Sequence, residues 1–263
     1  AEFPPGYDGR ALNDNWRIHS FSGWVAGMDL AHGSRSDHDL PGAAGDYPKG
    51  AQAGDVLHRL LDWRIQGTLT PERADPLLAG LGVEDTVATM AWIESIVTTP
   101  VLPGGLSIQE VPALPEMDFH FALGQVDGQA FDAAVQRHWS LPSRTNLPGD
   151  YLQGLMKGSL DLTLQADGRY WVLDYKSNFL GSQADYTQDA MRQQIAQHRY
   201  DVQAAVYLVA LHRLLKLRLP DYDPATHLGG AIYHFVRVPT ATCVWSITPQ
   251  AIGELEELLC PST

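Results

Sequence analysis

The sequence predicts an α/β domain in which a mixed central β-sheet is flanked by helices. Apolar and polar residues alternate over residues 116–123 and again over 157–164, as in half-buried strands. Apolar residues recur at helical spacing over 54–67, 84–97 and 187–219. With 263 residues, 44% of them apolar, the chain can bury one large core without disulfide or metal cross-links.

The N-terminal third is expected to contain irregular chain and two helices. Residues 1–15 are rich in Pro, Gly, Asp and Asn and predict a tail or linker before a domain over 16–263. Residues 33–54 are polar and Gly-rich, which predicts a loop. Helices are then predicted over 54–67 and over 84–97, the second ending before a proline.

The middle of the chain predicts two strands before a hairpin turn. The alternating residues 116–123 predict a strand, and 131–138 a helix followed by a loop. Residues 157–164 predict a second strand, joined by a turn at 166–168 to a return strand over 170–175. Three leucines are expected on one face of the second strand: Leu160, Leu162 and Leu164.

The C-terminal part predicts helices around two further strands. The helical stretch 187–219 is expected to break near His198. Strands are predicted over 231–238 and 244–247. Thr248 followed by proline predicts the start of a last helix over 249–259.

The charge balance limits the partners that the whole surface can attract. The formal net charge is −13, which argues against a broad nucleic-acid-binding surface, because phosphate contacts need Lys and Arg. Residues 187–219 reverse this balance locally, with five basic side chains and only Asp189 and Asp201 opposing them. This basic stretch either contacts a polyanion or is a solvated helix face, and composition favours the solvated face.

The cysteine content and the apolar runs exclude several classes of protein. Cys243 and Cys260 are too few for a disulfide framework or an iron–sulfur cluster, which excludes an iron–sulfur exonuclease. The apolar runs are too short for a membrane span, and no signal peptide opens the chain, so a reducing, cytoplasmic setting is expected. The first residue is Ala1 rather than Met, which is expected of a fragment or a processed product.

The predicted hairpin gathers residues with chemical potential. Asp161 lies on one strand, and Asp174 and Lys176 lie on the other, two residues apart and therefore on one face. Two carboxylates repel each other unless a cation lies between them, and Mg²⁺ prefers such oxygen ligands. A surface hairpin with an Asp–Lys salt bridge is the alternative interpretation, and the two are about equally supported by the pattern alone.

Two runs in this hairpin resemble motifs of a known nuclease family. Gly-Ser-Leu-Asp-Leu at 158–162 and Leu-Asp-Tyr-Lys-Ser-Asn at 173–178 resemble the G-x-x-D and D-Y-K-S-N motifs of the RecB-type nuclease domain, in the PD-(D/E)XK superfamily. Residues 198–207 are similar to the family's Q-x-x-x-Y helix, 54–58 to its histidine motif and 115–119 to its glutamate strand. Counting from Trp16, the resemblance covers nearly the whole chain.

The resemblance implies roles for individual residues. It implies metal ligation by His58, Asp161, Asp174 and the backbone carbonyl of Tyr175, because the Tyr175 side chain points away. It implies catalytic roles for the remaining members of the motifs: Glu116, Asp161, Asp174, Lys176, Gln203 and Tyr207.

Other interpretations of the same residues stay open. A histidine beside the apolar stripe of a helix is more often a core residue, Glu116 fits a solvated strand face, and Gln203 with Tyr207 fits an ordinary amphipathic helix. Asp118 shares the strand face of Glu116 and is a weaker candidate for the cluster.

The resemblance further implies a function and partners. The expected activity is that of a Mg²⁺-dependent deoxyribonuclease of the exodeoxyribonuclease V type, with Mn²⁺ able to substitute because an imidazole ligand suits it. Single-stranded DNA would be delivered by a helicase, and the implied partners are a RecB helicase portion, RecC and RecD. No phosphate-binding loop of an ATPase is present. The alternative is a catalytically silent, nuclease-like module that docks or binds DNA in a repair complex.

Overall fold

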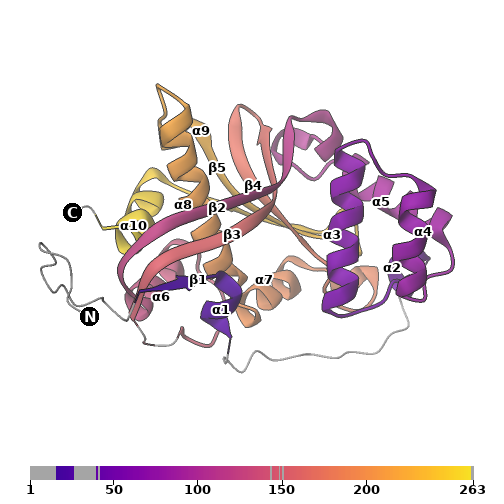
Figure 1. The fold of residues 1–263 in the computed structure, drawn as a ribbon, viewed down its shortest axis with the longest axis horizontal. Coiled ribbons are helices and arrows are strands. Elements are labelled where there is room, and N and C mark those ends of the chain that lie inside the picture. Colours follow the sequence, from indigo (N-terminus) through magenta and orange to yellow (C-terminus); the bar gives the residue numbers. More distant parts are fainter. Residues whose placement is uncertain are drawn as a thin grey trace, which may run out of the picture.

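The computed structural model describes residues 16–26, 40, 42–142, 144–147, 149 and 151–261, so the predicted tail at 1–15 lies outside the described residues. Figure 1 shows a curved sheet between two groups of helices. The elements follow in this order: β1 (Arg17–His19), α1 (Phe21–Val25), α2 (Ala43–Asp46), α3 (Ala51–Ile65), α4 (Pro71–Gly80), α5 (Thr86–Thr98), η1 (Pro103–Gly105), η2 (Ile108–Glu110), β2 (Ala113–Asp127), α6 (Gly128–His138), β3 (Tyr151–Ala166), β4 (Arg169–Lys176), η3 (Gln183–Asp185), α7 (Gln188–Gln197), α8 (Tyr200–Arg218), α9 (Pro224–His227), β5 (Leu228–Phe235), β6 (Thr242–Ser246) and α10 (Pro249–Leu259).

The sheet is mixed, which confirms the predicted fold class. Its order is β1-β3-β4-β5-β6, with β2 paired along the other edge of β3. The pairs β1–β3 and β4–β5 are parallel, whereas β2–β3, β3–β4 and β5–β6 are antiparallel. β3 therefore serves as the spine of the sheet, with β1 beside its beginning and β4 beside its end.

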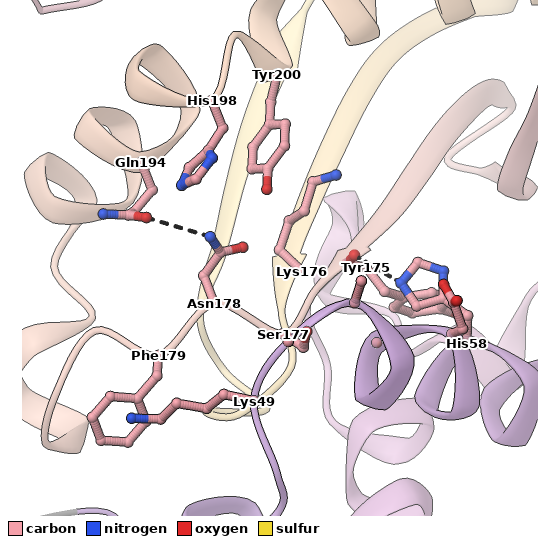
Figure 2. Close-up of a pocket in the computed structure, with 14 residues that line it drawn as sticks. Lys49, His58, Tyr175, Lys176, Ser177, Asn178, Phe179, Gln194, His198 and Tyr200 are labelled. Atoms are coloured by element: carbon pink, nitrogen blue, oxygen red, sulfur yellow. Dashed lines mark hydrogen bonds between the residues drawn. The ribbon is translucent and has the colours of Figure 1, made fainter. Parts of the chain in front are cut away.

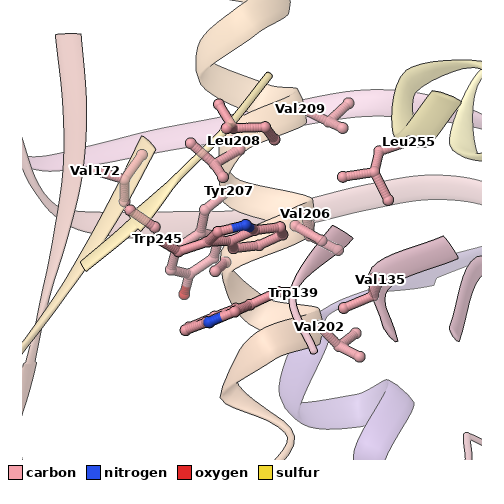
Figure 3. Packing of buried hydrophobic residues seen from close by; sticks show 14 of the residues in the cluster. Val135, Trp139, Val172, Val202, Val206, Tyr207, Leu208, Val209, Trp245 and Leu255 are labelled. Carbon is pink, nitrogen blue, oxygen red and sulfur yellow. The ribbon is translucent and has the colours of Figure 1, made fainter. Parts of the chain in front are cut away.

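Each face of the sheet carries its own hydrophobic core. One core lies under α6, α8 and α10, and the other lies under α3, α4 and α5 (Figure 1). In the first core, helix α8 is buried along most of its length, and the stacked indoles of Trp139 and Trp245, with centroids 4.6 Å apart, pack beside it (Figure 3). Burial of this helix between the sheet and α10 fixes the side chains at its N-terminal end.

The leucine side chains of β3 do not all point to one face of the sheet, contrary to the prediction. Leu160 packs into the core on the α8 side, whereas Leu162 and Leu164 pack into the core on the α3 side. The paired residues of β2 and β3 omit Glu116 and Asp161, and Glu116 has a φ of 48°. This irregularity resets the alternation of side chains, so that Asp161 lies where the strand changes faces.

The first third of the chain is more helical than predicted. The loop expected over 33–54 is wrong in its described part, because α2 lies within it and α3 begins at Ala51 instead of Gly54. Helix α4 was not predicted, since Pro71, Pro76 and a terminal glycine obscure its pattern and Ala74 and Leu78 are its only buried residues. Pro71 is tolerated because it occupies the first turn, where no backbone donor is needed.

The predicted break in the long helical stretch is confirmed between α7 and α8. Arg199 adopts a left-handed conformation there, with φ 56° and ψ 31°. Its side chain is completely buried and pairs with Asp132 and Asp201, while Arg213 and Lys216 pair with Glu256. Three of the five basic side chains of this stretch therefore belong to separate ion pairs.

Candidate active site

The hairpin of β3 and β4 brings together the two carboxylates and the lysine that the sequence singled out. Leu162 pairs with Leu173, and continuing this register by one residue places Asp161 opposite Asp174. Lys176 lies two residues farther along β4, and its Nζ is 2.5 Å from Oδ2 of Asp174. Asp174 and Lys176 are both buried, with 3% and 8% of their surfaces exposed.

His58 reaches this cluster from the middle of α3. Its Nδ1 lies 3.3 Å from Oδ2 of Asp161, and its Nε2 lies 3.2 Å from the carbonyl oxygen of Tyr175. The backbone N–H of Tyr175 donates to the same Asp161 oxygen at 3.0 Å, while the Tyr175 side chain is buried on the α3 side of the sheet. The structure thus brings together all four residues expected to bind metal, with only the backbone of Tyr175 facing the cluster.

The pKa values of the two carboxylates are shifted in opposite directions. Burial, together with the nearby charge of Asp161, raises the pKa of Asp174 to about 6. Burial acts on Asp161 in the same direction, but the neighbouring His58 and Lys176 outweigh it and lower the pKa of Asp161. For His58, burial is outweighed by Asp161, and the pKa is raised. Asp161 therefore holds its negative charge more readily than Asp174 does.

Lys176 is held in a well-defined environment on the α8 side of the sheet. Its Nζ donates to Oε1 of Gln203 at 3.0 Å, and Nε2 of Gln203 donates to the hydroxyl of Tyr207 at 3.1 Å. Burial alone would lower the pKa of Lys176, but Asp174 and other neighbours raise it. The amine is therefore held as a cation that can stabilise negative charge.

Two aromatic residues with no role assigned from the sequence complete the surroundings of Lys176. Nζ of Lys176 lies 3.7 Å from the ring centroid of Tyr200 and 5.3 Å from that of Tyr233, both within cation–π range. Tyr233 lies on β5 opposite Asp174, and its hydroxyl is 3.2 Å from Oε1 of Gln203. Their positions depend on the predicted break between α7 and α8 and on the parallel β4–β5 register, and no local pattern in the sequence specifies that register.

Glu116 lies beside the cluster and Asp118 does not. A small cavity of about 20 Å³ is lined by Glu116, His58 and Asp161 together with other residues. Asp118 lies two residues farther along β2, pairs with Ser159 and lines none of the described cavities at the site. The irregularity of β2 thus points the Glu116 side of the strand toward the carboxylates.

Comparison with known proteins agrees with this arrangement. The sequence model of the PD-(D/E)XK nuclease superfamily matches residues 34–257. The chain belongs to the PD-(D/E)XK nuclease superfamily. It is also similar to proteins named RecBCD enzyme subunit RecB. The match to the Haemophilus influenzae protein is 35% identical over 73% of this chain and 16% of that protein, and the match to the Escherichia coli protein is 33% identical over 87% and 21%.

The relatives are much longer than this chain. The RecB subunit of Mycobacterium tuberculosis is 29% identical over 87% of the chain and 26% of its own length. The chain thus spans between about a sixth and a quarter of these relatives. The matches confirm the predicted RecB-like nuclease domain. In the part of the chain that the structure describes, no helix is both long and apolar enough to cross a membrane.

The donor set fits the divalent metal ions that PD-(D/E)XK nucleases generally use. Among the described residues, no three His, Cys, Asp or Glu side chains already converge on one point. Oδ2 of Asp174 is buried, and its partner among the described residues is the ammonium group of Lys176, at 2.5 Å. Burial and the charge of Asp161 still raise the pKa of Asp174, so a divalent cation beside the two carboxylates would stabilise their charged forms.

A larger pocket opens beside this cluster. It has a volume of about 560 Å³ and is bordered by the beginning of α3, the end of β4 and the α7–α8 break (Figure 2). Lys176 and His58 both line it. The pocket therefore opens onto two members of the cluster.

Proposed function

We propose that the chain is a metal-dependent deoxyribonuclease domain that hydrolyses phosphodiester bonds, of the exodeoxyribonuclease V type. The observation that carries the proposal is the Asp161–Asp174–Lys176 cluster, in which two mutually repelling carboxylates lie beside a buried lysine, in a member of a nuclease superfamily. A silent docking module would not need to retain two mutually repelling buried carboxylates together with the lysine.

Asp161, Asp174, the carbonyl oxygen of Tyr175 and His58 would hold the metal, with Mg²⁺ expected and Mn²⁺ as a substitute. These donors are mostly hard oxygens, and the imidazole is a ligand that Mn²⁺ tolerates well. When bound, the metal would supply Lewis-acid stabilisation of phosphate charge and a more acidic water. Glu116 borders the same small cavity and would hold a water molecule there.

The protein side chains contribute positioning and charge. Lys176, kept cationic, would neutralise charge that develops on the phosphate during attack. Gln203 accepts the hydrogen bond from Lys176 and donates to Tyr207, so this pair would fix the direction of the ammonium group. The neighbouring Asp174 outweighs burial and raises the pKa of Lys176, which favours this electrostatic role.

The relatives suggest the biological setting. Because they are named as RecB subunits of the RecBCD enzyme, we propose that this domain works in a RecBCD-type assembly in double-strand-break repair and recombination. A RecB helicase portion, RecC and RecD would then be its partners, and a cytoplasmic location follows. The acidic chain, with a net charge of −13, would bind DNA weakly on its own and receive single strands from the helicase.

The direct test is cleavage of end-labelled single-stranded DNA with and without Mg²⁺. We expect metal-dependent cleavage by the chain and its loss in Asp174→Ala. Asp75→Asn on α4 is the matched control, because Asp75 is an exposed carboxylate far from the cluster along the chain, and it should cleave normally. Unchanged cleavage in Asp174→Ala would refute the assignment.

The silent module is tested by metal binding. An intact site should raise the melting temperature in Mg²⁺ or Mn²⁺, and Asp174→Ala should remove this rise. Metal binding without cleavage would indicate a site that needs its helicase partners. No cleavage and no effect of metal would favour the docking module.

A further inference from the structure

The pocket beside the cluster extends well beyond the reacting atoms. Its volume of about 560 Å³ is that of a site for a nucleotide-sized ligand. Lys176 and His58 line one end of it. Among the other lining residues are one exposed carboxylate, Asp55, and five side chains with no role in metal binding or in the lysine's positioning: Lys49, Asn178, Phe179, Gln194 and His198. Figure 2 shows Lys49 and Phe179 along the lower edge, and Gln194 and His198 along the upper edge.

A column of stacked groups leads from the active-site lysine into this pocket. Nζ of Lys176 lies 3.7 Å from the ring centroid of Tyr200. The ring of His198 stacks on Tyr200, with centroids 5.2 Å apart and planes inclined by 16°. Because both His198 and Tyr200 line the pocket, a planar base can extend the column by stacking against His198.

The opposite edge presents a cation in a defined place. Nζ of Lys49 lies 3.7 Å from the ring centroid of Phe179, which orients the ammonium group at the rim of the pocket. Between the two edges, Nδ2 of Asn178 donates to Oε1 of Gln194 at 3.3 Å, so amide groups line the space between them. A cation, an aromatic platform and amide groups together match the phosphate, base face and base edge of one nucleotide.

A buried arginine joins the parts of the chain that carry these residues. Arg237 is 1% exposed, and its guanidinium donates to the carbonyl of Pro48 at 2.9 Å and, through Nε, to that of Ser177 at 2.8 Å. Pro48 immediately precedes Lys49, and Ser177 immediately precedes Asn178. Burying a guanidinium is costly, and here its hydrogen bonds fix the two segments relative to each other.

We propose that this pocket is a nucleotide subsite for single-stranded DNA. His198 stacks on an unpaired base, Lys49 contacts the adjoining phosphate, and the neighbouring phosphate lies at Lys176. The assignment rests on the proposed nuclease function, and it adds the residues that would select an unpaired strand. A base within a duplex has neighbours on both faces, so only an unpaired base can stack on His198.

The test measures equilibrium binding without cleavage. Fluorescence anisotropy in EDTA compares the 263-residue chain binding labelled oligothymidylate with the same backbone made of abasic residues. His198→Ala should reduce the preference for bases by at least about fivefold, and His198→Phe should restore it, because stacking of one base contributes about 5- to 100-fold. His120→Ala, an exposed histidine on β2, is the matched control and should leave the preference unchanged.

Lys49 is tested through salt dependence. Lys49→Ala should weaken binding of both ligands by the same factor and reduce the slope of log affinity against log salt by about 0.7, the value for one phosphate contact on a single strand. Lys157→Ala, which removes an exposed lysine of β3, is its control. Melting temperatures equal to that of the wild-type chain would show that all variants are folded.

The outcomes separate the subsite from the nuclease. The subsite is refuted if His198→Ala weakens the binding of both ligands equally or of neither. It is also refuted if Lys49→Ala leaves the salt slope unchanged. Both results would count even where the chain cleaves DNA normally. If the base preference and the salt slope change as expected but the wild-type chain never cleaves with metal, the subsite stands and the proposed nuclease function fails.

Discussion

Two buried clusters of charged side chains lie in this molecule, and they are built on different principles. The structural quartet consists of Arg144, Arg199, Asp132 and Asp201, and its two cations match its two carboxylates. Asp132 also accepts a hydrogen bond from the backbone N–H of Leu147, at 2.9 Å. No atom of the quartet is among the buried polar atoms that lack a hydrogen bond in the described residues.

The candidate-site cluster of His58, Asp161, Asp174 and Lys176 instead holds two carboxylates that disturb each other. Asp174 is paired with Lys176, yet burial and the charge of Asp161 raise its pKa to about 6. The side chains of the quartet are at most 6% exposed, whereas those of His58 and Asp161 are 33% and 19% exposed. The contrast indicates that repulsion between carboxylates beside an open pocket, more than burial of charge, marks the candidate site.

The largest expected effect comes from Asp174→Asn, which should separate activity from stability. Removing this carboxylate should lower turnover by about a thousandfold or more, because the metal that would stabilise charge at the phosphate loses a ligand. The free energy of unfolding should fall by less than in Asp201→Asn, because the lost pairing with Lys176 is offset by the loss of a buried charge and of its repulsion from Asp161. Turnover and urea denaturation in EDTA, measured on the same preparation, check both parts, and a marked loss of stability would contradict the contrast.

An aspartate-to-asparagine substitution in the quartet should reduce stability and leave the activity of the folded chain intact. Asp201→Asn leaves Arg144 and Arg199 with one carboxylate in a site where Asp201 is completely buried. The free energy of unfolding should fall by about 3–5 kcal/mol, the cost of breaking a buried ion pair. The folded fraction should still cleave DNA. Urea denaturation compares the two asparagine variants directly, and equal stability would show that the quartet is as dispensable as the active-site carboxylate.

His234 provides a buried group that is neutral at pH 7 and belongs to neither cluster. Burial lowers its pKa from 6.5 to about 4, so between these values the unfolded chain binds a proton that the native chain does not. Stability should therefore fall by about 3 kcal/mol as the pH decreases from about 7 to 4. His234→Phe should flatten this part of the stability profile, and His120→Phe should not. An unchanged profile in His234→Phe would exclude His234 as the source.

The smallest effect is expected at an exposed ion pair. Arg64 donates to Glu94 through two hydrogen bonds, at 2.5 and 2.8 Å, but Glu94 is about half exposed. Glu94→Gln should change the free energy of unfolding by less than about 1 kcal/mol, and less still at high salt. A loss as large as that of Asp201→Asn would mean that burial does not govern the difference between the ion pairs.

Local patterns were sufficient for much of the fold. Alternation predicted the strands that became β2, β3 and β4, and helical spacing with a proline after Thr248 predicted the last helix at its observed bounds, Pro249–Leu259. These features depend on residues close together in the chain, where backbone geometry fixes which side chains share a face. Helix α4, with two prolines and few buried residues, lacked such a pattern.

The sequence by itself determined which residues are candidates for the site: the hairpin spacing placed Asp161, Asp174 and Lys176 together, and the family resemblance added His58, Glu116 and Gln203. Tertiary structure alone decided how these residues are held. The change of face at Asp161, the parallel pairing that sets Tyr233 opposite Asp174, and the buried contacts of Arg199 and Arg237 all join segments far apart in the chain. Such contacts form only when the whole core packs, so no local pattern encodes them.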